Sequence, residues 1–256
     1  MRILVLAQGV PDLVEGLEVA SDGVSLDQEW LKYVLNDFDD HALEEALQLK
    51  ADGGAEVVAL SPETDGSRDI LFTCLAKGAD RAVLVPGDWF GTDNHQKAKA
   101  LASLVKEIAP DLVLTGVQAP ADVDGQLGVL LAGNLHWTHV TTVKEVRLAD
   151  GKATVVKELE GGAGARYQVS LPAVLGIQAA RVPPRYVPVS KVRQAMKTAK
   201  LEEMEAPVQG ENILKVHKLY PPPSGERATM LDGDADTVAG ELVRILREKG
   251  IGRLAG

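Results

Sequence analysis

Cysteine is nearly absent from this chain of 256 residues, which holds only Cys74. One thiol cannot form an intramolecular disulfide, and it cannot build a metal site from several cysteines. Long hydrophobic runs are missing too, because no stretch approaches the roughly 20 apolar residues that span a bilayer. The short apolar run near residue 1 ends at Gly9 and Pro11, which predicts a first strand rather than a signal peptide. We therefore expect a cytoplasmic protein without direct membrane insertion.

Positive charge is also scarce. The chain has 27 Lys and Arg residues against 37 Asp and Glu residues, a formal net charge of −10. This sign argues against binding to nucleic acid, because a phosphate backbone attracts the opposite charge. The apolar share of 45% is typical of globular proteins, and the length predicts one or two domains.

Short apolar segments alternate with amphipathic segments over the first 135 residues. Strands are expected at residues 2–7, 56–60, 81–85 and 111–115, and helices at 39–50, 66–76, 95–108 and 122–135. This alternation predicts an α/β fold with a doubly wound, mainly parallel, Rossmann-like sheet. Ligands of such sheets bind beyond the carboxyl ends of the strands. The candidate ligand segments are residues 6–13, 61–66, 86–93 and 116–128.

The pattern changes after residue 138. Residues 140–147, 153–159 and 166–171 predict an antiparallel extension, and residues 173–178 predict another buried strand. Residues 183–223 are rich in proline and too long for an ordinary loop. They indicate either a disordered tail or an arm that wraps a partner. We favour the arm, because residues 234–249 beyond it predict an amphipathic helix.

The polar loop between the strand at 111–115 and the next helix is the strongest candidate site. Gly116 ends the strand, and Gly125 and Gly128 stand at the expected helix start. Free N–H groups and the helix dipole attract phosphate there, and small residues allow close approach. Gln118 and Gln126 could bind a base, ribose or phosphate. The alternative is an ordinary strand-to-helix loop, because neither the dinucleotide fingerprint nor the Walker A motif is present.

A second polar stretch, residues 36–40, precedes the helix at 39–50. Asn36 or Asp37 is expected to cap that helix, although the Asn36 amide could instead turn toward a ligand. Catalytic groupings are scarce. No histidine has metal-ligand neighbours, Cys74 is expected to be a buried inert thiol, and Glu44-Glu45 and Glu202-Glu203 are expected on solvated faces. We predict no catalytic side chain and no metal, which favours a carrier or binding role.

Seven segments together resemble the small (beta) subunit of electron transfer flavoprotein over nearly the whole chain. The matching segments are Gln8 to Asp12, Asn36 to Phe38, Ala42 to Ala46, Gly78 to Arg81, Gly116 to Gly128, Leu171 to Val174 and Pro184 to Tyr186. Each is weak alone, but their order and spacing are specific. The resemblance divides the chain into a nucleotide-binding α/β domain at 1–182 and, at 183–256, a recognition loop, arm and helix.

The resemblance implies a subunit that passes electrons between dehydrogenases and an acceptor through FAD. A large (alpha) subunit would hold this FAD, and the small subunit would bind an adenine nucleotide. The implied cofactor-binding positions are Leu6, Ala7, Leu13, Asn36, Phe38, Ser61, Gly116, Gln118, Ala119, Asp122, Val123, Asp124, Gly125, Gln126, Leu127 and Gly128. Of these, Leu13 and Phe38 would approach the shared flavin.

The resemblance also implies a recognition loop at residues 186–195. Tyr186, Val189, Val192 and Arg193 would dock a flavin-dependent dehydrogenase, such as an acyl-CoA dehydrogenase or a quinone oxidoreductase. Val189 would be its apolar anchor.

Several residues depart from the family pattern. Gln8 replaces a usual lysine, and Ala121 and Val123 stand where acids are commoner. Leu127 stands where members that hold AMP usually carry Thr or Ser, whereas an apolar residue accompanies a second FAD. The nucleotide is therefore AMP or a second FAD. Two alternatives follow: a subunit of a bifurcating flavoprotein that oxidises NADH, or a stand-alone adenine-nucleotide-binding module.

Overall fold

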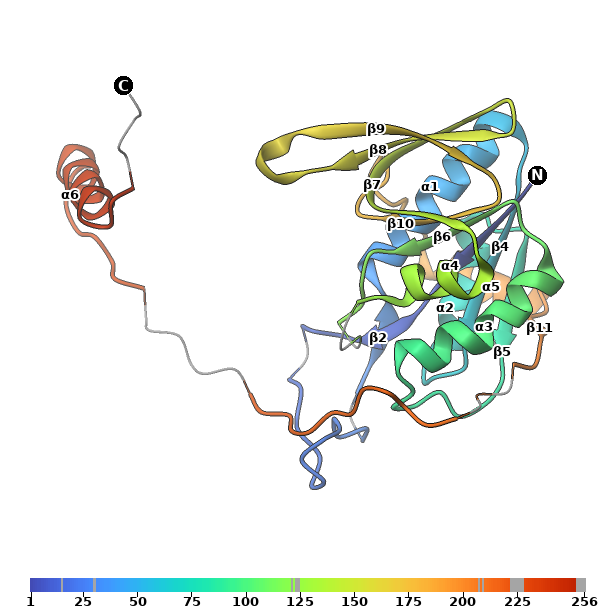
Figure 1. Cartoon of the computed structure of the whole chain (residues 1–256). Coiled ribbons are helices and arrows are strands. Elements are labelled where there is room, and N and C mark those ends of the chain that lie inside the picture. Colours follow the sequence, from blue (N-terminus) through green and yellow to red (C-terminus); the bar gives the residue numbers. More distant parts are fainter. Residues whose placement is uncertain are drawn as a thin grey trace. The chain divides into compact units, whose positions relative to one another are not determined.

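A long sheet organises the first part of the chain. The computed structural model describes residues 1–14, 16–29, 31–120, 122, 125–206, 208, 210–221 and 228–251. Within them, nine strands form one sheet in the order β11-β5-β4-β1-β6-β10-β7-β8-β9 (Figure 1). Their bounds are β1 Arg2–Leu6, β4 Glu56–Pro62, β5 Arg81–Val85, β6 Leu112–Gly116, β7 Thr138–Ala149, β8 Lys152–Glu158, β9 Gly164–Ser170, β10 Ala173–Ile177 and β11 Glu202–Glu203.

The strand directions confirm the predicted architecture. Every pair from β11 to β7 is parallel, and β7, β8 and β9 pair antiparallel. The central strands are apolar on both faces because both faces are covered. Ile3 and Val5 of β1 face one buried cluster, whereas Leu4 and Leu6 face another.

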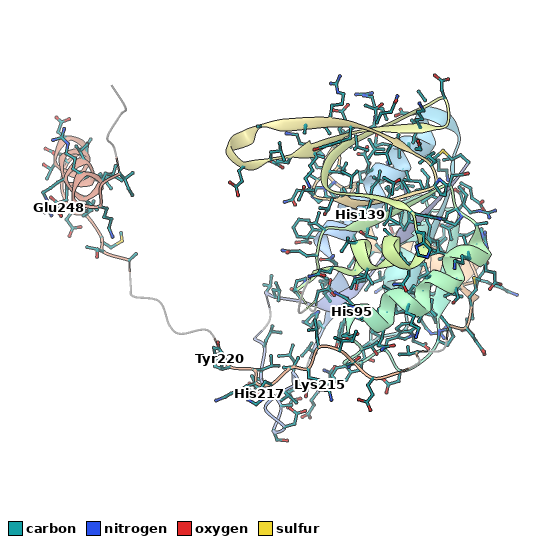
Figure 2. The ribbon with its side chains drawn as sticks, in the orientation of Figure 1. His95, His139, Lys215, His217, Tyr220 and Glu248 are labelled. Atoms are coloured by element: carbon teal, nitrogen blue, oxygen red, sulfur yellow. The ribbon has the colours of Figure 1, made fainter. Side chains whose placement is uncertain are left out.

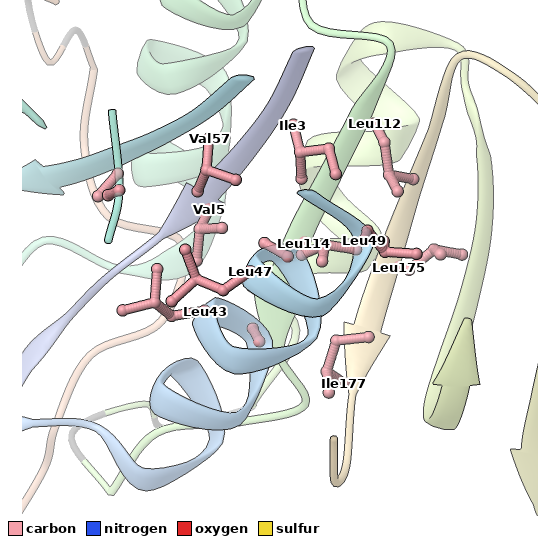
Figure 3. Packing of buried hydrophobic residues seen from close by; sticks show 14 of the residues in the cluster. Ile3, Val5, Leu43, Leu47, Leu49, Val57, Leu112, Leu114, Leu175 and Ile177 are labelled. Carbon is pink, nitrogen blue, oxygen red and sulfur yellow. The ribbon is translucent and has the colours of Figure 1, made fainter. Parts of the chain in front are cut away.

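Helices cover both faces of the sheet, as a doubly wound fold requires. Helices α1 (Asp37–Gly53) and α2 (Ser67–Lys77) supply one cluster, and α3 (Asn94–Ile108) and α4 (Leu127–Leu135) supply the other. Figure 3 shows Leu43 and Leu47 of α1 beside Val5 of β1. Cys74 lies in the same cluster, and burial raises the pKa of its thiol to about 12, as expected of an inert cysteine.

Two elements beside the ends of β1 and β6 differ from the sequence-based expectation. Helix α4 begins at Leu127 rather than at residue 122, because Gly125 adopts a φ of +61° that an α-helix cannot contain. A small antiparallel pair, β2 (Gly9–Pro11) with β3 (Tyr33–Leu35), was not predicted. Both differences bear on the candidate site, because both flank the ends of β1 and β6.

The described residues between 183 and 219 are ordered on their own domain. Helix α5 (Val189–Thr198) packs on α2, and β11 pairs with the edge strand β5. The Asp93 carboxylate then accepts the N–H groups of Ile213 and Leu214. Long-range pairing within the chain therefore places this part of residues 183–223 against its own domain, and the expectation that a partner gives the segment its order stays a prediction. Its docking role stays a prediction.

Contacts divide the chain into two units, Met1–Leu219 and Tyr220–Gly256. The second contains helix α6 (Ala235–Glu248), which confirms the helix predicted at residues 234–249. Asp234 caps α6, because its side chain accepts the N–H of Thr237. Among the described residues, no helix is both long and apolar enough to cross a bilayer.

Candidate functional site

The candidate site lies at the point in the sheet where the order of successive strands changes direction, between β1 and β6. From β1 the chain proceeds to β4 and β5 on one side, then returns to β6 on the other side. The carboxyl ends of β1 and β6 are therefore neighbours with diverging connections, the usual ligand position in an open α/β sheet. Residues 7–9 and 116–120 lead away from these two ends, and the first turn of α1 lies beside them.

A buried carboxylate ties the two strand ends together. Asp39 in the first turn of α1 is fully buried. Its Oδ2 accepts the N–H of Gln8 at 2.9 Å, and its Oδ1 accepts the N–H of Gly116 at 2.7 Å. A Cβ at Gly116 would lie 2.6 Å from Cβ of Phe38 and 2.7 Å from Oδ1 of Asp39, so only glycine allows this approach.

Asn36 joins α1 to the loop after β6. Its side-chain amide donates to the carbonyl oxygen of Gln118 at 2.9 Å, and its backbone N–H donates to the carbonyl oxygen of Gln8 at 3.0 Å. Its side chain makes no capping bond to α1. Of the two roles considered for Asn36, the structure thus shows the amide turned toward the loop, where it bonds to protein backbone.

The start of α4 offers a small, polar surface. The first N–H groups of any helix lack partners within the helix, which makes this end attractive to anions. A Cβ at Gly128 would lie 2.7 Å from Oγ1 of Thr115, so the helix approaches β6 closely. This buried Thr115 hydroxyl has no hydrogen-bond partner in the described part of the chain. A polar atom left in this way is unusual and typical of a site that receives a ligand or water.

The expected site residues fall into three groups. In the first group Asn36 donates to Gln118, Gly116 donates to Asp39, and Phe38 packs against Gly116. The members of a second group are buried or partly buried. It comprises Ala7, Ser61, Ala119, Asp122, Gly125 and Gly128, with Gln126 exposed. Val123 and Asp124 lie outside the described residues.

The third group points away from the loop. The side chains of Leu6 and Leu127 pack in the cluster beneath α3 and α4, so these positions present backbone to the site. Leu13, in the turn after β2, is 62% exposed. No described contact connects it to Asn36, Gly116 or Gln118.

The two adjacent acids of α1 are not solvated, which corrects the sequence-based expectation. The Glu44 carboxylate accepts three N–H groups of Arg185, including Nε at 2.7 Å, and the Glu45 carboxylate accepts Nε of Arg181 at 2.9 Å. Both carboxylates are buried. Burial opposes ionisation of Glu44, but the hydrogen bonds of Arg185 and Gln48 outweigh it and lower the pKa of Glu44. At Glu45 burial outweighs Arg181 and raises the pKa.

These ion pairs hold the chain just before the expected docking segment. Tyr186 is 84% exposed and Val189 is 62% exposed, while Val192 is half-buried and Arg193 is exposed. The segment is a helix rather than a loop from Val189 onward. The acids at 202 and 203 are also paired, since Glu202 binds Arg81 and Glu203 binds Arg68.

Metal-ligating residues are dispersed. Figure 2 shows His95, His139 and His217 on separate segments. No group of three or more His, Cys, Asp or Glu side chains that could hold a metal occurs in the described residues. Burial lowers the pKa of His139, which favours its neutral form.

Comparison with known proteins shows the family of this chain. The family model for the electron transfer flavoprotein domain matches residues 25–209. The beta subunit of electron transfer flavoprotein from Methylophilus methylotrophus is 35% identical over 262 residues, which cover 97% of this chain and 98% of the relative. The chain belongs to the electron transfer flavoprotein beta-subunit family.

Two further relatives of this electron transfer flavoprotein subunit are similar over comparable lengths. The beta subunit from Syntrophomonas wolfei is 31% identical, covering 96% of each chain. Subunit CarD of the caffeyl-CoA reductase-Etf complex from Acetobacterium woodii is 32% identical, covering 98% of this chain and the whole relative. The resemblance drawn from the sequence is thus confirmed at the level of the family.

Sequence reasoning missed Asp39 as a member of the site. Asp39 follows Asn36 by three residues, a spacing that indicates a helix start in which the acid interacts locally. The structure instead directs its carboxylate to Gln8 and Gly116, which are distant in sequence. The available signal was Gly116 at the end of a buried strand, since a glycine there indicates a close approach of another group.

Proposed function

We propose that this electron transfer flavoprotein subunit binds an adenine nucleotide in the loop between β6 and α4. It would pair with a large subunit and pass electrons through FAD between a dehydrogenase and an acceptor. The observation that carries the proposal is the hydrogen-bonded junction of Asn36, Asp39, Gly116 and Gln118 at the switch point of the sheet. FAD, when bound, supplies the redox chemistry, and the protein supplies binding and orientation.

The residues present fit an adenylate. The loop offers the N–H groups at the start of α4, glycines at 125 and 128, and the exposed Gln118 and Gln126 side chains. The orphaned Thr115 hydroxyl lies beside Gly128. These are neutral donors and acceptors that suit a phosphate, a ribose and a base. Asp122 would lie near the sugar or base rather than the phosphate, because two anions repel each other.

The nucleotide is AMP or a second FAD. The buried Leu127 side chain provides no hydroxyl to a phosphate, so AMP would lose a charge-assisted hydrogen bond worth about 1.5–3 kcal/mol. This loss favours the second FAD. If that flavin accepts a hydride from NADH, the subunit belongs to a bifurcating NADH-oxidising flavoprotein. Stopped-flow mixing of the heterodimer with NADH tests this, and absence of flavin bleaching rejects it.

Helix α5 is the proposed docking surface for a dehydrogenase. Val189 and Tyr186 are exposed apolar groups on a segment fixed by the buried Glu44–Arg185 and Glu45–Arg181 pairs. Four exposed cations surround them, namely Lys191, Arg193, Lys197 and Lys200, and no acid occurs from residue 186 to residue 200. The dehydrogenase is therefore expected to present an acidic rim around an apolar pocket.

Co-expression with a gene for an electron transfer flavoprotein large subunit tests the function. We expect a heterodimer that contains FAD, whose flavin is reduced by substrate only when a matching dehydrogenase is added. Val189→Asp should slow this reduction at least about tenfold through lost apolar contact, with Tyr167→Asp on the exposed face of β9 as the surface control. A chain that purifies alone, folded and without flavin, would instead favour a stand-alone nucleotide-binding module.

A further inference from the structure

Three buried acids follow one another on α1, and one of them differs from the others. Glu44 and Glu45 are paired with Arg185 and Arg181. Asp39 is equally buried, yet in the described part of the chain it forms no ion pair, and its two oxygens accept the backbone N–H groups of Gln8 and Gly116. A buried carboxylate without a cation is costly to keep in its charged form.

We propose that Asp39 is a positioning residue that holds the ends of β1 and β6 in the arrangement that binds the adenylate. This inference rests on the proposed function. The two N–H donors lie 31 and 77 residues from Asp39 in the sequence, so the carboxylate joins segments that nothing local aligns. Gly116 begins the nucleotide loop, and the position of its N–H determines where that loop leaves the sheet.

The geometry requires two acceptor atoms. A carboxyl group can accept at both oxygens, whereas an amide of the same shape offers one oxygen and one NH₂ group. In Asp39→Asn, the new NH₂ group would face either the N–H of Gln8 or the N–H of Gly116. These nitrogens lie 2.9 Å and 2.7 Å from the carboxylate oxygens of Asp39. One strand end would then move, although the variant buries no charge and keeps its volume.

The surroundings of Asp39 also couple its proton to the ligand. Burial raises the pKa of Asp39 to about 7, although the N–H groups of Gln8 and Gly116 and the Asn36 amide lower it. Asp122 faces it from the loop and raises the pKa further, and Cys74 on α2 is a neutral thiol. A nucleotide phosphate adds negative charge and favours the protonated acid. Binding is therefore expected to take up a proton near neutral pH.

The test uses the full-length chain purified with its large subunit and stripped of nucleotide. Affinity for AMP and for FAD is measured by calorimetry at about pH 6, 7 and 8, in buffers of different ionisation enthalpy. The wild-type protein should bind more weakly as the pH rises above 7, with proton uptake. Asp39→Asn should bind at least about tenfold more weakly at pH 6, and its proton uptake should be lost.

Glu45→Gln is the matched control. It alters a buried acid of the same helix that also accepts backbone N–H groups, those of Val146 and Arg181, away from the loop. It should lose stability but keep wild-type affinity and proton uptake. The role of Asp39 would be overturned, with the proposed function left standing, by wild-type affinity and proton uptake in Asp39→Asn. Equal losses of affinity and proton uptake in the two variants would overturn it as well. A wild-type protein that binds neither nucleotide would overturn the proposed function as well. Should Asp39→Asn not fold, wild-type binding without proton uptake near pH 7 would overturn the coupling, and uptake beyond that of the nucleotide's own phosphate would support it.

Discussion

The side-chain amide of Asn36 donates a 2.9 Å hydrogen bond to the backbone carbonyl oxygen of Gln118, 82 residues further along the chain. Asn36 is buried at the start of α1, while the Gln118 side chain is exposed in the loop after β6. The bond therefore fixes the backbone of the loop and leaves the Gln118 side chain available to a ligand.

Asn36→Ala removes this bond. We expect a loss of about 1 kcal/mol in the free energy of unfolding and a several-fold weaker affinity for the adenine nucleotide, since the loop backbone is no longer held. The control is Asn134→Ala, because Asn134 also donates to a backbone carbonyl, that of Leu130, but within the exposed part of α4. Equal nucleotide affinity in the two variants would contradict the role of the Asn36 bond.

Gly116→Ala should disrupt the junction between α1 and β6. The new methyl group would lie 2.6 Å from Cβ of Phe38, so the helix or the strand must shift, at a cost of about 1–3 kcal/mol. Gly133→Ala provides the contrast, because nothing lies within 4 Å of its Cβ position in α4, and it should stabilise by about 0.5–1 kcal/mol. Urea unfolding measures both values, and the same sign for both would refute this packing.

Among the described residues, Glu45→Gln leaves Arg181 with only the exposed Asp52 as an ionic partner. Because removal of one member of a buried pair leaves an uncompensated charge, we expect a destabilisation of about 3 kcal/mol or more. Glu203→Gln breaks the exposed pair with Arg68 and should cost less than about 1 kcal/mol. Similar values in thermal unfolding of the two variants would show that burial of Glu45 does not matter.

The pH dependence of the free energy of unfolding should reveal the ionisation of Asp39. Its pKa of about 7 in the folded protein lies above the unfolded value of 3.8, so the folded state binds the proton more tightly. This contribution to stability is present at low pH and is lost as the pH rises through 7. Relative to wild type, Asp39→Asn should therefore gain about 2.5 kcal/mol between about pH 5 and about pH 8. A difference that stays constant over this range would contradict the buried ionisation.

The sequence predicted the central strands well, because each is a run of apolar residues buried on both faces. The strand at 81–85 coincides with β5, and that at 111–115 overlaps all but the last residue of β6. Helix α4 was predicted to begin too early, because the acids at 122 and 124 are typical of a first helical turn. The positive φ of Gly125 excludes a helix that begins at residue 122, and this φ is a property of the folded loop.

The buried ion pairs could not be predicted from local sequence. Glu44 and Glu45 lie between Leu43 and Ala46 on an amphipathic helix, where acids usually face solvent. Their partners Arg185 and Arg181 lie more than 130 residues away. Helix α5 was missed for a related reason, since it follows Pro188 in a proline-rich segment and is amphipathic only over ten residues. Its order depends on packing against α2, which no short pattern encodes.

The most direct test of the account counts the cofactors released when the purified heterodimer is denatured. We predict one adenine nucleotide from the small subunit in addition to the FAD shared with the large subunit. One FAD with one AMP would exclude the second flavin, and two FAD molecules would exclude AMP. A heterodimer that releases a single FAD and no other adenylate would contradict the proposal that the loop between β6 and α4 binds a nucleotide.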